Sequence, residues 1–207
     1  MPSTQPARMA DHWWWRPGWR PGRRFYTWHF TFQESSDVHR LAGEYRKSLA
    51  TVAGLDLVPD RWLHLTIQGL GFVDEVSEQD VKAIVGAAAE RLSRVPAFEL
   101  SVGRPEITPE AIRWEASPGE PPRTVRTEIR AAIGEVWAAV PEPEDGFAPH
   151  ISIAYSNAEG PASLVADALA RVEAEPATAR LASVELIVLN RDHRMYEWER
   201  FARVPLG

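Results

Sequence analysis

Two similar strings of four residues constrain this chain more than any other feature. Residues 64–67 read His-Leu-Thr-Ile, and residues 150–153 read His-Ile-Ser-Ile. Successive side chains of a β-strand point to opposite faces, so each string places an imidazole and a hydroxyl on one face and two aliphatic side chains on the other. If the two strands lie side by side, they predict one cleft lined by His64, Thr66, His150 and Ser152.

These four side chains suit phosphoester chemistry without a metal. One neutral imidazole can take a proton from water or a ribose hydroxyl, while the other, protonated, gives a proton to the leaving oxygen. A histidine pKa of about 6.5 makes both forms accessible near neutral pH. The hydroxyls of Thr66 and Ser152 can hold the nonbridging phosphate oxygens. A metal bound by His64 and His150 is the alternative, but neither string has Asp or Glu on the histidine face to complete a ligand set.

The rest of the chain alternates between strand and helix patterns. We expect strands at 25–32, 62–68, 98–102, 112–116, 150–155, 184–189 and 195–203. Apolar stripes predict helices within 38–49, 81–92, 125–137 and 165–172, the second opened by a capping box of Ser77 and Asp80. This mixture indicates an α+β fold in which helices cover the outer faces of antiparallel sheets. A chain of 207 residues buries enough surface to fold without disulfides, and the absence of cysteine excludes thiol nucleophiles.

The N-terminal segment, residues 1–24, differs from the remainder of the chain, residues 25–207, which we expect to form a single domain. Four tryptophans stand among its arginines, and Pro-Gly pairs break any periodicity. We expect an irregular arm that clasps the domain surface. Stacking on bases and pairing with phosphates is one alternative. Contact with a membrane surface or with a second copy of the chain is another.

At the first histidine string the sequence resembles the bacterial 2′-5′ RNA ligase-like branch of the 2H phosphoesterase superfamily. Residues 64–71, HLTIQGLG, are similar to its HLTL-x-F-L-G string, and the second string supplies the second His-x-Thr/Ser-x motif. The resemblance covers roughly residue 25 to the C-terminus. It implies a bilobal fold, in which two pseudo-symmetric lobes of antiparallel sheet with outer helices surround a central cleft. It also implies that His64 and His150 are the acid and base, and that Thr66 and Ser152 hold the phosphate.

Two positions depart from that family pattern. Tyr155 stands where many members of the branch carry a phosphate-binding arginine, and Gly69 replaces the usual aromatic residue. Strict alternation turns Tyr155 away from the His150 face unless the strand ends or bulges first. Other candidates for substrate binding are His29 or its neighbour Trp28, if the first strand lines the cleft, and Arg61, which precedes the first motif strand. We assign no role to the remaining histidines.

The hypothesis is therefore a metal-independent phosphoesterase that needs no cofactor. It would hydrolyse, or reversibly form, a 2′,3′-cyclic phosphate or a 2′-5′ phosphodiester bond in a small nucleotide or an RNA end. The net charge of −6 argues against extended duplex nucleic acid as a partner. With neither a long apolar run nor a secretory signal, we expect a cytoplasmic protein with no membrane partner and a monomer by default. The alternative function is a nucleotide- or RNA-binding protein of the same fold, with little catalysis, that binds through the arm.

Overall fold

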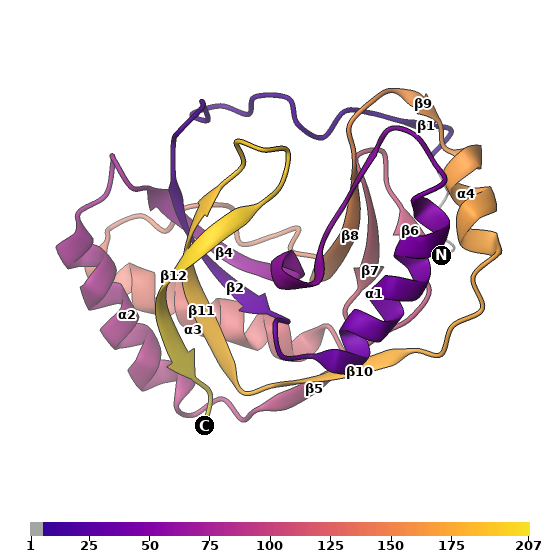
Figure 1. Cartoon of the computed structure of the whole chain (residues 1–207). Helices are drawn as coiled ribbons and strands as arrows, with labels where there is room; N and C mark the ends of the chain where they lie inside the picture. The colour runs from indigo at the N-terminus through magenta and orange to yellow at the C-terminus, as the bar shows by residue number, and fades with distance from the viewer. Residues whose placement is uncertain (1–5) are drawn as a thin grey trace.

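The computed structural model describes residues 6–207, and within this range it is an α+β structure (Figure 1). Its helices are α1 (Ser36–Leu49), α2 (Glu78–Leu92), α3 (Glu120–Val136) and α4 (Ser163–Ala170), with a 3₁₀ turn, η1, at Asp60–Trp62. Its strands are β1 (Arg8–Met9), β2 (Phe25–Thr31), β3 (Leu55–Leu57), β4 (His64–Phe72), β5 (Phe98–Val102), β6 (Glu106–Ile107), β7 (Ala111–Glu115), β8 (His150–Ser156), β9 (Gly160–Pro161), β10 (Ala177–Leu181), β11 (Ser183–Asn190) and β12 (Glu197–Pro205). No helix of the described range combines the length and apolar character needed to span a membrane.

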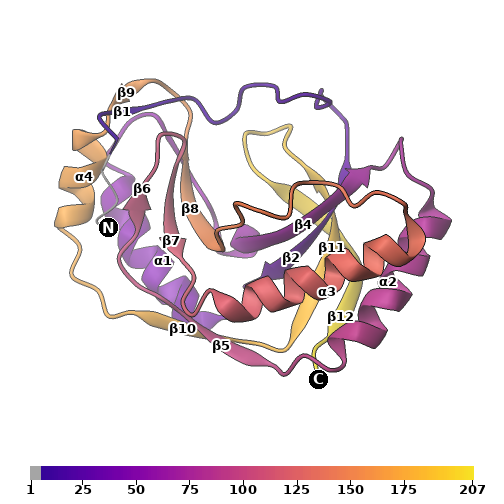
Figure 2. The ribbon, with the colours of Figure 1, turned by 180° about the vertical axis from the view of Figure 1, so that it is seen from behind.

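Two four-stranded antiparallel sheets form two lobes. The first lobe has strand order β12-β11-β2-β4 and carries α2 and α3. The second lobe has strand order β3-β8-β7-β6 and carries α1 and α4. The helices lie on the outside of each lobe, and the β5-β10 ribbon runs beneath both (Figures 1 and 2). The expectation of an α+β fold with antiparallel sheets and outer helices is confirmed.

The two lobes are not the two halves of the sequence. The first sheet joins β2 and β4 from the N-terminal half to β11 and β12 from the C-terminal end. The helices also cross between the lobes: α1 follows β2 of the first lobe but packs on the second lobe, and α3 follows β7 of the second lobe but packs on the first. Each lobe therefore depends on chain segments that are far apart in sequence, which ties the two lobes into one unit.

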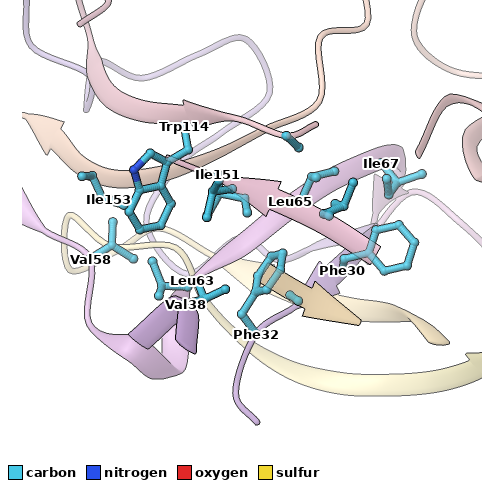
Figure 3. Close-up of a cluster of buried hydrophobic side chains, with 14 of the residues drawn as sticks. Phe30, Phe32, Val38, Val58, Leu63, Leu65, Ile67, Trp114, Ile151 and Ile153 are labelled. Carbon is cyan, nitrogen blue, oxygen red and sulfur yellow. The ribbon is translucent and has the colours of Figure 1, made fainter. Parts of the chain in front are cut away.

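The apolar members of both histidine strings meet in one core. Leu65 and Ile67 of β4 and Ile151 and Ile153 of β8 are all almost fully buried in the same cluster, together with Trp114 of β7 (Figure 3). Burying an aliphatic side chain of this size stabilises the fold by roughly 1.5–3 kcal/mol. Because the apolar faces of the two strands share this core, their polar faces are turned toward the same side.

Some element boundaries differ from the pattern in the sequence. The first motif strand begins at His64, because residues 60–62 form the η1 turn. Helix α3 starts at Glu120, several residues earlier than its apolar stripe, since the prolines that follow Glu120 are tolerated in a first helical turn. Ser77 caps α2, but Asp80 does not complete the capping box: its carboxylate accepts from the Trp137 indole at 3.1 Å.

The N-terminal arm crosses from one lobe to the other; its first five residues lie outside the described range. Strand β1 pairs with β9 on the second lobe, and the Trp13 indole donates to Asp56 at 2.8 Å. At its far end Arg23 bonds Asp74 at 2.9 Å and lies over the Phe72 ring of the first lobe. In Figures 1 and 2 the arm runs over the top of the space between the lobes. Apart from β1 it is irregular, as its Pro-Gly pairs predict.

Candidate active site

A cleft of about 500 Å³ opens between the lobes, beneath the arm. All four motif residues line it: His64 and Thr66 from β4, and His150 and Ser152 from β8. A cavity of this size accommodates a small ligand such as a nucleotide. The other lining residues are His12, Arg16, Trp19, Phe25, Thr27, His29, Thr108, Glu110, Ala111, Arg113, Glu142, Tyr155, Leu189 and Tyr196.

The two motif histidines are oriented by the same local device. In each, Nδ1 lies 2.8 Å from the carbonyl oxygen two residues earlier in the chain, at Trp62 for His64 and at Ala148 for His150. A carbonyl only accepts, so Nδ1 carries the hydrogen in both rings. The neutral tautomer is therefore fixed, and Nε2 of each ring is left free for a ligand in the cleft.

His29 of β2 packs against the side chains of the first motif. Its ring stacks on that of His64 with the centroids 4.6 Å apart and the planes nearly parallel. Its Nε2 lies 3.2 Å from the Thr66 hydroxyl, whereas its Nδ1 is buried without a partner in the described structure. His29 thus contacts both the imidazole and the hydroxyl of the first motif, and Thr66 itself is open to the cleft.

Burial lowers the pKa of the site histidines. It lowers the pKa of His64 to about 4, against a smaller opposing effect of the bond to the Trp62 carbonyl. Burial also lowers the pKa of His150, and the nearby Arg113 guanidinium adds to that effect. The pKa of His29 lies well below its usual value because the ring is buried and faces His64. All three rings are neutral at pH 7 when the cleft holds no anion.

Tyr155 faces the cleft because β8 bulges before it. Arg113 of β7 pairs with Ser152 and the adjacent Ile112 pairs with Ala154, so Ile153 is an extra residue in β8. This bulge shifts the alternation by one residue and brings Tyr155 to the same face as His150 and Ser152. The ring stacks on His12 at 4.4 Å, and burial raises the pKa of the Tyr155 hydroxyl.

Arg113 supplies a cation beside the second motif. It lies directly across from Ser152 in the sheet and lines the cleft, and its Nε donates to Glu106 at 2.6 Å. Its positive charge therefore stands next to the motif that lacks the arginine usual in the family. Arg113 was not among the candidates from the sequence, although its charged side chain between the apolar Ile112 and Trp114 of a strand was a signal for it.

The arm contributes His12, Arg16 and Trp19 to the cleft wall. Glu110 of the second lobe holds two of them, accepting from His12 Nδ1 at 3.1 Å and from Arg16 at 2.8 Å. Tyr196 donates to His12 Nε2 at 2.9 Å, and burial lowers the pKa of His12 to about 4. No local pattern in the sequence indicated that the arm reaches the site, because these contacts join residues about a hundred or more positions apart.

Two of the candidates for substrate binding lie elsewhere. Trp28 is fully buried on the opposite face of β2 from His29, so it packs in the core instead of lining the cleft. Arg61 lies in η1, exposed, with its guanidinium 5.1 Å from the Trp62 ring, and it is not among the lining residues. The expectations for Trp28 and Arg61 are corrected accordingly, whereas His29 and Tyr155 do line the cleft. Within residues 6–207 no three side chains of metal-binding type gather into a cluster.

Comparison with known proteins identifies the fold and the family. The model of the 2′-5′ RNA ligase superfamily matches residues 22–193. The crystal structure of TT0787 from Thermus thermophilus is similar with a TM-score of 0.66 at 20% identity, covering 89% of this chain and 97% of the other. That of E. coli LigT complexed with 3′-AMP has a TM-score of 0.63 at 15% identity, covering 89% and 99%. A search of curated proteins by sequence finds no match.

The fold and the paired motifs define a two-histidine (2H) phosphoesterase architecture. The chain belongs to the 2′-5′ RNA ligase superfamily. The matched range begins at residue 22, so most of the arm lies outside it.

Proposed function

We propose that this protein is a metal-independent phosphoesterase that hydrolyses a 2′,3′-cyclic phosphate or a 2′-5′ phosphodiester bond in a small nucleotide or an RNA end. One observation carries the proposal. His64 and His150, from different lobes, line one cleft, and each has Nδ1 bonded to a backbone carbonyl so that Nε2 is free. With Nε2 free on both rings, one imidazole can accept a proton and the other can donate one on opposite sides of the same phosphorus atom.

In hydrolysis of a cyclic phosphate, the oxygen of a water molecule forms a new bond to phosphorus while the bond to one ribose oxygen breaks. Nε2 of one imidazole accepts the proton that the water loses, and the other imidazolium gives its Nε2 proton to the leaving ribose oxygen. The hydroxyls of Thr66 and Ser152 donate to the nonbridging oxygens, whose negative charge grows in the transition state. One water is consumed, and the two histidines exchange protonation states.

The lowered pKa values determine how the acid obtains its proton. Both histidines are neutral in the empty cleft, because burial disfavours the charged ring. A bound phosphate places a negative charge beside them and raises the pKa of both. We assign the base to His64, the more deeply buried ring, and the acid to His150, which is more open to solvent and takes up the proton on substrate binding.

The dimensions and covering of the cleft favour a compact substrate. Its volume of about 500 Å³ suits a nucleotide, and Arg16 and Trp19 of the arm form part of its wall. The related E. coli LigT has been crystallised with 3′-AMP, ATP and NADP⁺. We infer that this chain likewise accepts a small nucleotide, or the terminal nucleotide of an RNA.

The experiment is incubation of the purified protein, in EDTA, with the four 2′,3′-cyclic mononucleotides and a 2′-5′-linked dinucleotide, followed by chromatography of the products. We expect turnover of at least one cyclic nucleotide to a single monophosphate isomer, which identifies the bond that breaks. Turnover that requires added metal contradicts the mechanism. No turnover of any of these compounds contradicts the proposed activity.

The alternative function, nucleotide or RNA binding through the arm, requires arm side chains that are available to a ligand. Arg16, Arg20 and Arg23 bond carboxylates of the chain itself, which favours the cleft. Trp14 and Trp15 are about half exposed, at 48% and 50%. A variant with both replaced by alanine distinguishes the functions: an arm-based binding protein loses most of its nucleotide affinity, whereas the cleft enzyme keeps its turnover.

A further inference from the structure

One loop of the second half of the chain places a carboxylate in the cleft at an energetic cost to the backbone. Glu142, between α3 and β8, has φ 63°, a left-handed conformation that only Arg194 shares among the non-glycine residues of the described chain. Side chains other than glycine rarely adopt this conformation, and it persists where surrounding contacts enforce it. Such residues often serve the function of a site, and specific contacts hold Glu142 in this conformation.

Two arginines of α3 fix the loop. Arg126 donates to the carbonyl oxygens of Pro143 and Glu144, each at 2.7 Å, and to that of Ile67 in β4 at 3.1 Å. Arg130 donates to the carbonyl oxygens of Pro141 and Glu142, at 3.1 and 3.0 Å. The loop is therefore bonded to a helix of the first lobe on both sides of Glu142, and its geometry is set before any ligand arrives.

The carboxylate of Glu142 sits on β4 in the space that Gly69 leaves. Its Oε2 accepts from the backbone N–H of Gly69 and from Gln68 Nε2, both at 3.1 Å. A Cβ at position 69 would lie 2.3 Å from Glu142 Oε1, closer than atoms approach. The glycine that departs from the family pattern is thus the feature that admits this carboxylate. Oε1 makes no hydrogen bond within the described structure, and Glu142 lines the cleft.

The position of Glu142 relative to the motifs matches the dimensions of a nucleotide. In the first sheet Thr66 pairs with His29, and Gly69 pairs with Thr27, two residues further along β2. Two residues of a strand span about 7 Å. With a phosphate held at Thr66, the carboxylate lies where the far edge of an attached base would reach. The rings of Trp19 and Phe25 line the same end of the cleft and offer surfaces for stacking.

We propose that Glu142 reads the base of the substrate and selects guanine; this inference rests on the proposed function, since it assumes a nucleotide with its phosphate at the motifs. Guanine presents two adjacent donors, N1–H and N2–H, and both can bond the free Oε1 of Glu142, because Oε2 already accepts from Gly69 and Gln68. Adenine and cytosine each present one amino donor beside a ring nitrogen that accepts, and uracil presents one donor between two carbonyls. Each of these three turns a lone pair toward the carboxylate.

The test is equilibrium binding of 3′-GMP, 3′-AMP, 3′-CMP and 3′-UMP, measured by calorimetry. We expect the wild-type protein to bind 3′-GMP about 10-fold or more tightly than each of the others, the low end for hydrogen bonds to a charged group because Glu142 is open to solvent. Glu142→Gln should lose this preference, since its amide N–H groups meet the donors of guanine. Glu144→Gln, on the same loop and exposed, is the matched control and should keep it.

A second variant tests the position of the carboxylate without changing it chemically. Gly69→Ala should abolish the guanine preference as Glu142→Gln does, because the added methyl displaces Oε1. The same methyl lies 3.0 Å from the Phe25 ring, so we expect the affinities for all four nucleotides to fall together while the difference between 3′-GMP and 3′-UMP disappears. Equal affinities for the four nucleotides, no binding at millimolar concentration, or a preference that survives in both variants would overturn the inference. A guanine preference in a protein that hydrolyses no cyclic nucleotide would overturn the proposed activity alone.

Discussion

Acidification from pH 7.5 to pH 5.0 should destabilise this protein strongly, because His12 and His64 are buried in the neutral form. Both are less than a tenth exposed, and burial lowers the pKa of each to about 4. In the unfolded chain the same rings titrate near 6.5. Between pH 6.5 and 4 the unfolded state therefore binds more protons than the folded state, so stability falls as the pH falls.

The size of the effect follows from the two pKa values. At pH 5.0 a ring with a pKa of about 4 when folded and about 6.5 when unfolded loses roughly 2 kcal/mol of stability relative to pH 7.5. His12 and His64 together account for roughly 4 kcal/mol, and His29 adds to it in the same direction. His193 acts in the opposite direction, because Glu197 raises its pKa, but this ring is exposed.

Urea unfolding followed by tryptophan fluorescence at pH 7.5, 6.5, 5.5 and 5.0 measures the loss. His193→Gln serves as the control and should leave the pH dependence nearly unchanged, whereas His12→Gln should reduce it by about one histidine's share. Histidine NMR titration gives the independent check, since the buried rings should show no protonation above pH 5. Equal stability at pH 7.5 and 5.0, or buried rings that titrate near 6.5, would show that these histidines are not buried in the neutral form.

The pH dependence of kcat/KM reports the free enzyme, in which the base His64 must be neutral and the acid His150 must be protonated. The profile should therefore be bell-shaped, rising through the His64 pKa of about 4 and falling through the lowered pKa of His150, with its maximum below pH 6.5. An optimum above pH 7 would contradict the assignment of the two histidines. Thr66→Ala and Ser152→Ala should each cost roughly 2–4 kcal/mol of transition-state stabilisation, seen in kcat by steady-state kinetics with little change in folding; unchanged rates would show that neither hydroxyl holds the phosphate. Glu110→Gln should lower the free energy of unfolding by about 1–2 kcal/mol and speed limited proteolysis of the arm, because this carboxylate bonds several arm side chains, and an equally resistant arm would exclude that role.

The motif strands could be predicted because their information is local. Alternation alone assigns the histidine and hydroxyl of each string to one face, and the structure brings all four side chains to one cleft. The same rule fails at Tyr155, where the bulge at Ile153 reverses the face. Alternation also could not decide whether Trp28 or His29 faces the cleft, since no residue of the first strand shows which of its two faces is turned toward the cleft.

The remaining cleft residues depend on contacts between distant segments. Glu142 reaches the cleft because Gly69, more than seventy positions earlier, leaves room for its carboxylate. Arg16 of the arm meets Glu110 across a separation of 94 residues. The interleaving of the lobes is also hidden, because β11 pairs with β2 across a long stretch of chain that contains elements of both lobes. Periodicity describes single elements and carries no information on which of them pair.

In the proposed mechanism His64 and His150 transfer the protons of one reaction. We would measure kcat/KM with a 2′,3′-cyclic nucleotide, in EDTA, for the wild type, His64→Ala, His150→Ala and the exposed control His193→Ala, together with the affinity of each for the monophosphate product. We expect a loss of at least about 100-fold for each motif variant, with folding preserved and the control unchanged. Either motif variant turning over at close to the wild-type rate would contradict it.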